Sequence, residues 1–121
     1  MKSFGIVLLL LIIIMGGCIR PSCTDILPSY STYDSALTAI KQSSFDLEEE
    51  ADVSNSEWID GAYFYSCNMS TGYFVIVIDS KQYLYNDVPI NIWEGFKEAK
   101  SCGSYYDHHI KGRYQYHLKR Y

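Results

Sequence analysis

The sequence predicts a small α+β domain, a three-stranded antiparallel meander followed by one main helix and a second short helix, with an N-terminal signal and a tether before it. Three observations indicate this. The chain has 121 residues, enough for one small domain at most. Its first seventeen residues are mostly apolar, and after Val53 three short runs of aromatic and β-branched residues alternate with turn residues. There is no glycine-rich phosphate loop, which excludes nucleotide-binding α/β folds.

Residues 1–17 predict a cleaved secretion signal. Lys2 precedes an apolar run that extends from Phe4 to Met15, and this run is shorter than the roughly 20 residues of a membrane-spanning helix. Met15-Gly16-Gly17-Cys18 resembles the processing site of bacterial lipoproteins, in which the cysteine receives diacylglycerol and an amide-linked acyl chain such as palmitate. The resemblance implies that Cys18 is lipidated and anchors the protein in a bacterial membrane, outer or plasma, within the cell envelope. The alternative is an ordinary signal peptide, with Cys18 as a plain thiol.

The mature chain divides by charge. Residues 18–60 hold nine acids against two basic residues, whereas residues 61–121 hold seven basic residues against five acids. We therefore expect residues 18–52 to be an acidic tether, with a short helix over 32–42 capped by Ser31. Residues 53–121 are expected to form the folded domain.

Three runs within the second part predict strands: Trp58 to Tyr65, Tyr73 to Ile78, and Gln82 to Asn86. Asp79-Ser80-Lys81 predicts a tight hairpin between the last two. Pro89 suits the first turn of a helix that extends through Lys100 and is stopped by Gly103. A second short helix is expected over 104–111, followed by a terminal strand or an extended arm over 114–118.

The middle strand is apolar on both faces, because Tyr73, Val75 and Val77 alternate with Phe74, Ile76 and Ile78. Helices on one face would leave the other bare. We expect intramolecular cover of that face, and a partner protein or a second copy of the chain could cover it instead. The candidate covering residues are Leu37, Ile40, Phe45 and Leu47.

Cys23, Cys67 and Cys102 are the remaining cysteines and, after export, the candidates for a disulfide. Cys67 lies in the turn at one end of the meander, and the main helix carries Cys102 about 18 Å towards the other end. A bond requires Cα atoms within about 7 Å, so Cys67 and Cys102 are not expected to pair. We expect any disulfide to involve Cys23. No cysteine or histidine spacing indicates zinc.

The C-terminal part resembles the KTSC domain, which is named for its occurrence at the end of some lysyl-tRNA synthetases. The resemblance extends from about Val53 to Tyr116, although the turn glycine expected near Ser80 is absent. The family's Tyr-x-Tyr, Val-Pro, Ala-x-Ser-x-Gly and His-Ile-x-Gly-x-Tyr-x-Tyr motifs correspond to Tyr83, Tyr85, Val88, Pro89, Ala99, Ser101, Gly103, His109, Ile110, Gly112, Tyr114 and Tyr116, with Tyr105 as the aromatic between the last two motifs. The activity of this family is unknown, so the resemblance implies a fold and only a conjecture of nucleic-acid binding.

Most motif residues also have a structural interpretation. Tyr83 and Tyr85 share one face of a strand and are expected to pack on the helix that contains Trp93 and Phe96. A functional groove formed by Tyr105, His109, Arg113 and Tyr116 is the competing interpretation. No acid pair and no Ser/His/Asp or Cys/His set has a recognisable spacing, so neither a catalytic residue nor a metal or cofactor site is predicted.

The sequence therefore favours a membrane-anchored, non-enzymatic binding module, whose partner is an unidentified protein or a polyanion of the envelope. Six basic residues and five tyrosines between Lys97 and Tyr121 favour a polyanion-binding face as the second interpretation. Nucleic acid fits the same face, but export disfavours it. Self-association and a small enzyme with a Tyr/His/Arg groove stay open as well.

Overall fold

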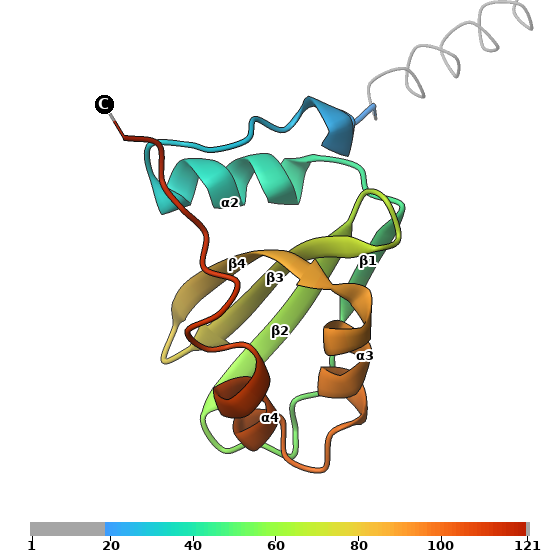
Figure 1. Ribbon diagram of the computed structural model, residues 1–121, viewed down its shortest axis with the longest axis vertical. Coiled ribbons are helices and arrows are strands. Elements are labelled where there is room, and N and C mark those ends of the chain that lie inside the picture. Colours follow the sequence, from blue (N-terminus) through green and yellow to red (C-terminus); the bar gives the residue numbers. More distant parts are fainter. Residues whose placement is uncertain (1–18, 121) are drawn as a thin grey trace, which may run out of the picture.

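Four strands form one antiparallel sheet, and helices cover both of its faces (Figure 1). The computed structural model describes residues 19–120. The strands follow one another in the order β1-β2-β3-β4, and every neighbouring pair is antiparallel. The strands are β1 (Leu47–Glu50), β2 (Ile59–Ser66), β3 (Thr71–Ile78) and β4 (Lys81–Pro89), and the helices are the short 3₁₀ helix η1 (Cys23–Asp25), α2 (Tyr33–Gln42), α3 (Ile90–Glu98) and α4 (Cys102–His109). The predicted α+β class and antiparallel meander are confirmed.

The meander has four strands and not the expected three, because part of the acidic run expected in the tether forms β1 beside β2. Leu47 and Glu49 of β1 turn toward the α3 side, where Leu47 packs against the core. The Glu49 carboxylate accepts a hydrogen bond from Trp93 Nε1 at 2.7 Å and forms an ion pair with Lys97 Nζ at 2.9 Å. These partners explain how a run of glutamates becomes part of a sheet. The backbone pairs with β2, and the negative charge of the half-buried Glu49 carboxylate is balanced by Lys97.

The hairpin between β3 and β4 forms where it was expected, with Asp79 and Ser80 between the paired Ile78 and Lys81. Both turn residues have positive φ, 50° for Asp79 and 65° for Ser80. This is the backbone that two-residue hairpins require, and it is usually supplied by asparagine and glycine. The chain therefore forms this turn without the glycine that is expected near Ser80.

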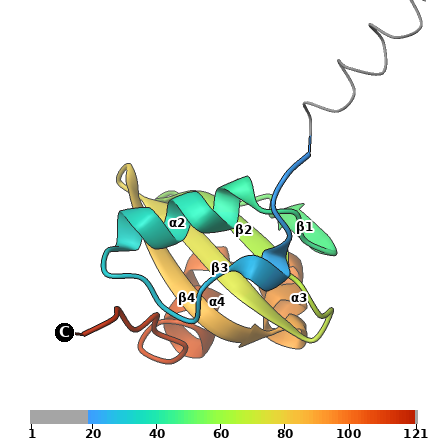
Figure 2. The ribbon, with the colours of Figure 1, turned by 90° about the horizontal axis from the view of Figure 1, so that it is seen from above.

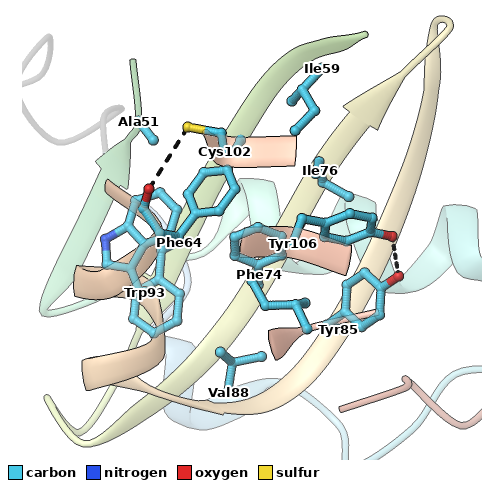
Figure 3. Packing of buried hydrophobic residues seen from close by; sticks show 13 residues of the cluster. Ala51, Ile59, Phe64, Phe74, Ile76, Tyr85, Val88, Trp93, Cys102 and Tyr106 are labelled. Carbon is cyan, nitrogen blue, oxygen red and sulfur yellow. Dashed lines mark hydrogen bonds between the residues drawn. The ribbon is translucent and has the colours of Figure 1, made fainter. Parts of the chain in front are cut away.

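The core between the sheet and α3 and α4 is aromatic (Figure 3). The Phe64 ring stacks on Trp93 at 5.2 Å between centroids, and Phe74 meets both Trp93 and Phe96 edge to face. All four of these side chains are fully buried. Such contacts add to the free energy of apolar burial, so this layer is the main source of stability.

The turn between α3 and α4 differs from the expectation in one respect. α3 ends at Glu98, and α4 begins at Cys102 behind Ser101, whose hydroxyl accepts from the Ser104 amide as an N-cap. Gly103 therefore does not stop the first helix but lies in the first turn of the second. A Cβ at Gly103 would lie 2.7 Å from the Trp58 ring, so the glycine is required by close packing and not by a turn.

The second face of the sheet is covered by α2, as expected for an intramolecular cover, and α2 crosses the strands in the view from above (Figure 2). Leu37, Ile40 and Phe45 are buried there against Val75 of β3. Leu47, the fourth candidate, packs on the opposite face. The helix is capped by Thr32, whose hydroxyl accepts from the Ser35 amide, and not by Ser31.

The segment before α2 is fixed to the sheet by a disulfide between Cys23 and Cys67, whose Cα atoms lie 5.9 Å apart. This is one of the pairings open to Cys23. Cys102 is a buried free thiol. Residues 20–50, most of the segment 18–52 that was expected to be a tether, are thus held by η1, α2, β1 and the disulfide. The division into domains at residue 52 stays a prediction.

The chain after α4 forms an extended arm along β4. The Asn86 amide donates to the Tyr114 carbonyl at 2.8 Å, and Gln115 forms a bridge with Tyr85. The arm then crosses to the α2 side, where the Lys119 amide donates to the Tyr30 carbonyl at 2.8 Å. The arm therefore ties the free edge of the sheet to the α2 layer.

Candidate functional site

The four residues of the expected groove do not come together. The rings of Tyr105 and His109 pack against each other on α4, with centroids 4.4 Å apart and a tilt of 34°, and Arg113 is exposed in the turn that follows. Tyr116 lies on the other side of the sheet, buried in the α2 layer and 6.3 Å from the Tyr33 ring. The arm crosses from one face to the other between Arg113 and Tyr116, a change of direction that the spacing of the residues does not reveal.

Most motif residues of the C-terminal part contribute to packing or to chain geometry. Val88 and Ile110 are fully buried, and Tyr85 is 7 % exposed. The hydroxyls of Tyr85 and Tyr106 hydrogen-bond to each other (Figure 3), and burial raises the pKa of both groups, so the pair is neutral. The remaining positions shape the backbone. Pro89 and Ala99 flank α3, and Ser101 caps α4. Gly112 has a φ of 78°, and the Tyr114 carbonyl accepts a hydrogen bond from the Asn86 amide.

Tyr83 is the exception among the motif residues. Its side chain is 42 % exposed at the edge of the sheet, where we expected it to pack against α3. Beside it lies a cleft of about 450 Å³, whose walls come from β4, α2 and the arm. The lining residues are Tyr33, Gln82, Tyr83, Leu84, Tyr85, Gln115 and Tyr116. The sequence contained one signal for this exposure, because Tyr83 follows the predicted hairpin turn closely and the end of a strand has few neighbours to cover it.

Backbone groups are also open at this cleft. The Asn86 amide points away from β3 to reach the arm, so by the alternation of antiparallel strands the Gln82 and Leu84 backbone groups point outward as well. Within residues 19–120, the outward amide and carbonyl of Gln82 have no backbone partner. The Gln82 side chain accepts a hydrogen bond from Lys41 of α2. We call residues 82–84 of β4, with this cleft, the open edge.

The thiol of Cys102 is not a candidate nucleophile. It is fully buried, and its Sγ lies 3.8 Å from the carbonyl oxygen of Phe96 (Figure 3) and 3.8 Å from that of Asp52. Burial raises the pKa of this thiol, so the reactive thiolate is disfavoured. Within residues 19–120, no group of three His, Cys, Asp or Glu side chains is arranged to hold a metal ion.

Basic side chains gather around α4 and the arm. Lys100, Lys111 and Arg113 are exposed at the α4 end, and Lys119 and Arg120 are exposed on the arm. Lys97, by contrast, pairs with Glu49 and Glu94. A stacking platform for nucleic acid would need exposed tyrosines near these cations. Tyr85 and Tyr116 are buried and Tyr114 is half-buried, so Tyr83 alone of the motif tyrosines on β4 and the arm is well exposed.

Part of the chain that contains these features matches a known family model. Residues 75–114 match the family model of the KTSC domain. The match confirms the KTSC part of the prediction over the second half of β3, β4, α3 and α4, whereas the resemblance was expected to extend from Val53 to Tyr116. No curated protein and no solved structure matches the chain. The KTSC domain is not a known enzyme family, and its function is unknown.

The remaining sequence prediction concerns the membrane. The signal over residues 1–17 and the lipidation site Cys18 lie outside the described residues. From Ile19 to Arg120 there is no helix with the length and hydropathy needed to cross a bilayer.

Proposed function

We propose that this protein is a lipid-anchored, non-enzymatic binding module of the bacterial cell envelope, which holds an extended segment of a partner protein at the open edge. The observation that carries the proposal is the combination of Tyr83, exposed within a KTSC motif, with the unpaired outward backbone groups of Gln82. An added strand would use those groups, and the cleft of about 450 Å³ would receive its side chains.

The C-terminal arm supports this mode of binding. It already lies on β4 in an extended conformation at Tyr85 and Asn86, and it turns away beyond Gln115. The unused part of the same edge continues directly from the used part. The neighbouring Tyr33 ring, 49 % exposed on α2, supplies a second aromatic surface for side chains of the partner.

Site-specific photocrosslinking tests the proposal. The Tyr83 side chain is replaced by p-benzoylphenylalanine in the full-length protein, and its native membranes are irradiated. Asp107, exposed on α4, receives the same replacement as a control. We expect a covalent adduct from position 83 and none from position 107.

A proline at position 82 then tests whether the backbone binds. Because the Gln82 amide points outward, Gln82→Pro removes the amide that an added strand would use and leaves the bonds between β3 and β4 in place. We expect the adduct to disappear while the circular dichroism spectrum is unchanged. An adduct of unchanged yield would contradict strand addition, and an adduct of twice the mass of the chain would identify a second copy as the occupant.

The basic end of the domain supports a second candidate function, polyanion binding. Lys100, Lys111 and Arg113 are exposed, and none has a carboxylate partner in the described part of the chain. Such a surface retains polyanions in a salt-dependent manner. We expect the domain without its lipid to be retained on heparin at low salt and released as salt rises, and passage without retention would contradict this function.

A further inference from the structure

The chain is fixed to the domain almost immediately after Cys18. The Arg20 guanidinium pairs with Glu48 of β1 at 3.0 Å and also donates to the Ser43 carbonyl. Three residues later, the Cys23 amide donates to the Ser44 carbonyl at 3.0 Å, and Cys23 forms the disulfide with Cys67. The residues that follow Arg20 are therefore not available as a long tether.

This attachment limits how far the domain lies from a lipid on Cys18. Arg20 is the second residue after Cys18, and an extended chain spans at most about 3.6 Å per residue, so the reach is about 7 Å. That distance is no larger than the headgroup layer of a bilayer, which is roughly 5–8 Å thick on each side. A lipidated Cys18 would bring this corner of the domain to the membrane surface.

The same corner carries exposed apolar side chains. Ile19 is 86 % exposed, Leu27 is 55 % exposed and Met69 is 52 % exposed, and each lies within four residues of a cysteine of the disulfide. We call these three residues, with the disulfide, the disulfide corner. Partial insertion of such side chains into the boundary between headgroups and acyl chains is favourable and adds to the anchoring by lipid.

The other functional features lie at the opposite end of the sheet. Cys67 follows β2 at one end, whereas the hairpin between β3 and β4, next to the open edge, is at the other, and α4 lies away from η1 (Figure 1). β3 has eight residues, which at about 3.3 Å per residue separate the two ends by about 26 Å. A domain resting on its disulfide corner would present the open edge and the basic end of α4 away from the bilayer.

We infer that the disulfide corner lies on the bilayer surface, that Ile19, Leu27 and Met69 contact the lipid, and that the open edge and the basic α4 end face away from it. The inference rests on the proposed lipid anchor at Cys18. It assigns the basic end to a partner other than the lipid of the protein's own membrane. Asp25 and Asp46 at the same corner are exposed and have no cationic partner within residues 19–120, so the contact is with the apolar boundary and zwitterionic headgroups rather than with anionic lipid.

Fluorescence quenching by lipid tests the orientation. The full-length lipidated protein with Leu27→Trp is reconstituted into phosphatidylcholine vesicles with brominated acyl chains. We expect the emission added by Trp at position 27 to be lost, while the emission of the unsubstituted protein, from Trp58 at the far end of β2 and buried Trp93, is unchanged. Asp107→Trp, on exposed α4, is the matched control and should keep its added emission.

Two further measurements separate the inference from the proposed function. Mass spectrometry and co-sedimentation with the vesicles report the anchor, and an unacylated protein that does not co-sediment would contradict the proposed function itself. An acylated, vesicle-bound protein whose Leu27→Trp emission is quenched no more than that of Asp107→Trp would overturn the orientation alone.

A longer tether tests the role of the short reach. Twenty Gly and Ser residues inserted between Cys18 and Ile19 form a flexible linker with an average span of about 25 Å. We expect co-sedimentation to persist and the quenching of Leu27→Trp to fall to the level of the control. Quenching that stays complete after the insertion would overturn the argument from tether length.

Discussion

On the α3 and α4 side of the sheet, Phe64, Phe74 and Trp93 pack ring against ring and are fully buried. On the α2 side, Leu37 and Phe45 pack against smaller or partly exposed neighbours, and a disulfide and the C-terminal arm hold the layer in place. The first side is covered by helices within residues 75–114, the segment that matches the KTSC family, whereas α2, η1 and the end of the arm lie outside it.

The difference indicates that the two layers are stabilised by different means. Burial of aromatic rings holds α3 and α4 on the sheet, aided by the bonds of Trp93 and Lys97 to Glu49, and no disulfide reaches these helices in the described part of the chain. The α2 layer has a smaller core and depends on a covalent bond and on backbone contacts with the arm. A disulfide of this kind forms and persists in oxidising surroundings. Three measurements test this comparison.

The largest effect is expected from truncating a phenylalanine on each face. Phe74 is fully buried among Tyr85, Trp93 and Phe96, whereas Phe45 is 9 % exposed and, within residues 19–120, meets two aromatic rings, Tyr65 and Tyr73. We expect Phe74→Ala to lower the free energy of unfolding by about 3–5 kcal/mol and Phe45→Ala by about 1–2 kcal/mol less. Urea denaturation of the two variants measures both values, and equal losses would contradict the ranking of the two layers.

A smaller loss is expected when the disulfide is removed. Cys23 and Cys67 are 44 residues apart in sequence, so replacing both by serine releases a long loop and should lower stability by about 2–4 kcal/mol. Hydrogen exchange should accelerate more in α2 than in α3. Dithiothreitol should reproduce the change in the unsubstituted protein and leave the double variant unaffected. Faster exchange confined to α3 would show that the bond does not serve the α2 layer.

The smallest effect on stability is expected in β1, where the neighbouring residues Glu48 and Glu49 point to opposite faces of the sheet. The Trp93 indole and the Lys97 ammonium hold the pKa of Glu49 below its usual value of 4.5, so its charged form stabilises the fold at neutral pH and this contribution is lost as pH falls through the lowered pKa. We expect Glu49→Gln to cost about 1 kcal/mol at pH 7 and progressively less as the pH falls through the lowered pKa of Glu49.

Glu48→Gln is the matched control for this measurement. Glu48 pairs with Arg20, but the two side chains are 36 % and 46 % exposed. Such an exposed pair typically contributes about 0.2–1 kcal/mol, and we expect the loss in Glu48→Gln to be smaller than that in Glu49→Gln. Denaturation curves recorded from pH 7 to pH 3 compare the two variants, and an equal loss at pH 7 would show that β1 does not distinguish the two faces.

The elements after Val53 could be predicted from sequence because their apolar residues recur at the spacing of a strand or a helix. Alternating aromatic and β-branched residues indicate β2, β3 and β4, and the spacing of Trp93 and Phe96 indicates α3. β1 was missed because three consecutive glutamates are typical of a solvated tether. Only the tertiary contacts of Glu49 with Trp93 and Lys97 make that run compatible with a sheet.

The candidate site was less accessible to prediction. Tyr105 and His109 were correctly placed on one helix face, since they are four residues apart. Tyr116 could not be assigned to a face, because the path of the arm is set by its bridge to Tyr85 and its contact with Tyr30, which are both distant in sequence. The exposure of Tyr83 likewise depends on β4 being the last strand of the sheet.

The position of the arm also determines when the protein can finish folding. During synthesis from the N-terminus, η1, α2 and the four strands emerge before Tyr116, a buried residue of the α2 layer. Until Tyr114 emerges, the edge of β4 is uncovered at Asn86, and until Tyr116 emerges, the α2 face of the sheet lacks one of its buried side chains. A nascent chain therefore stays incompletely folded until the whole arm, including the Lys119 amide that bonds to the Tyr30 carbonyl, has been synthesised.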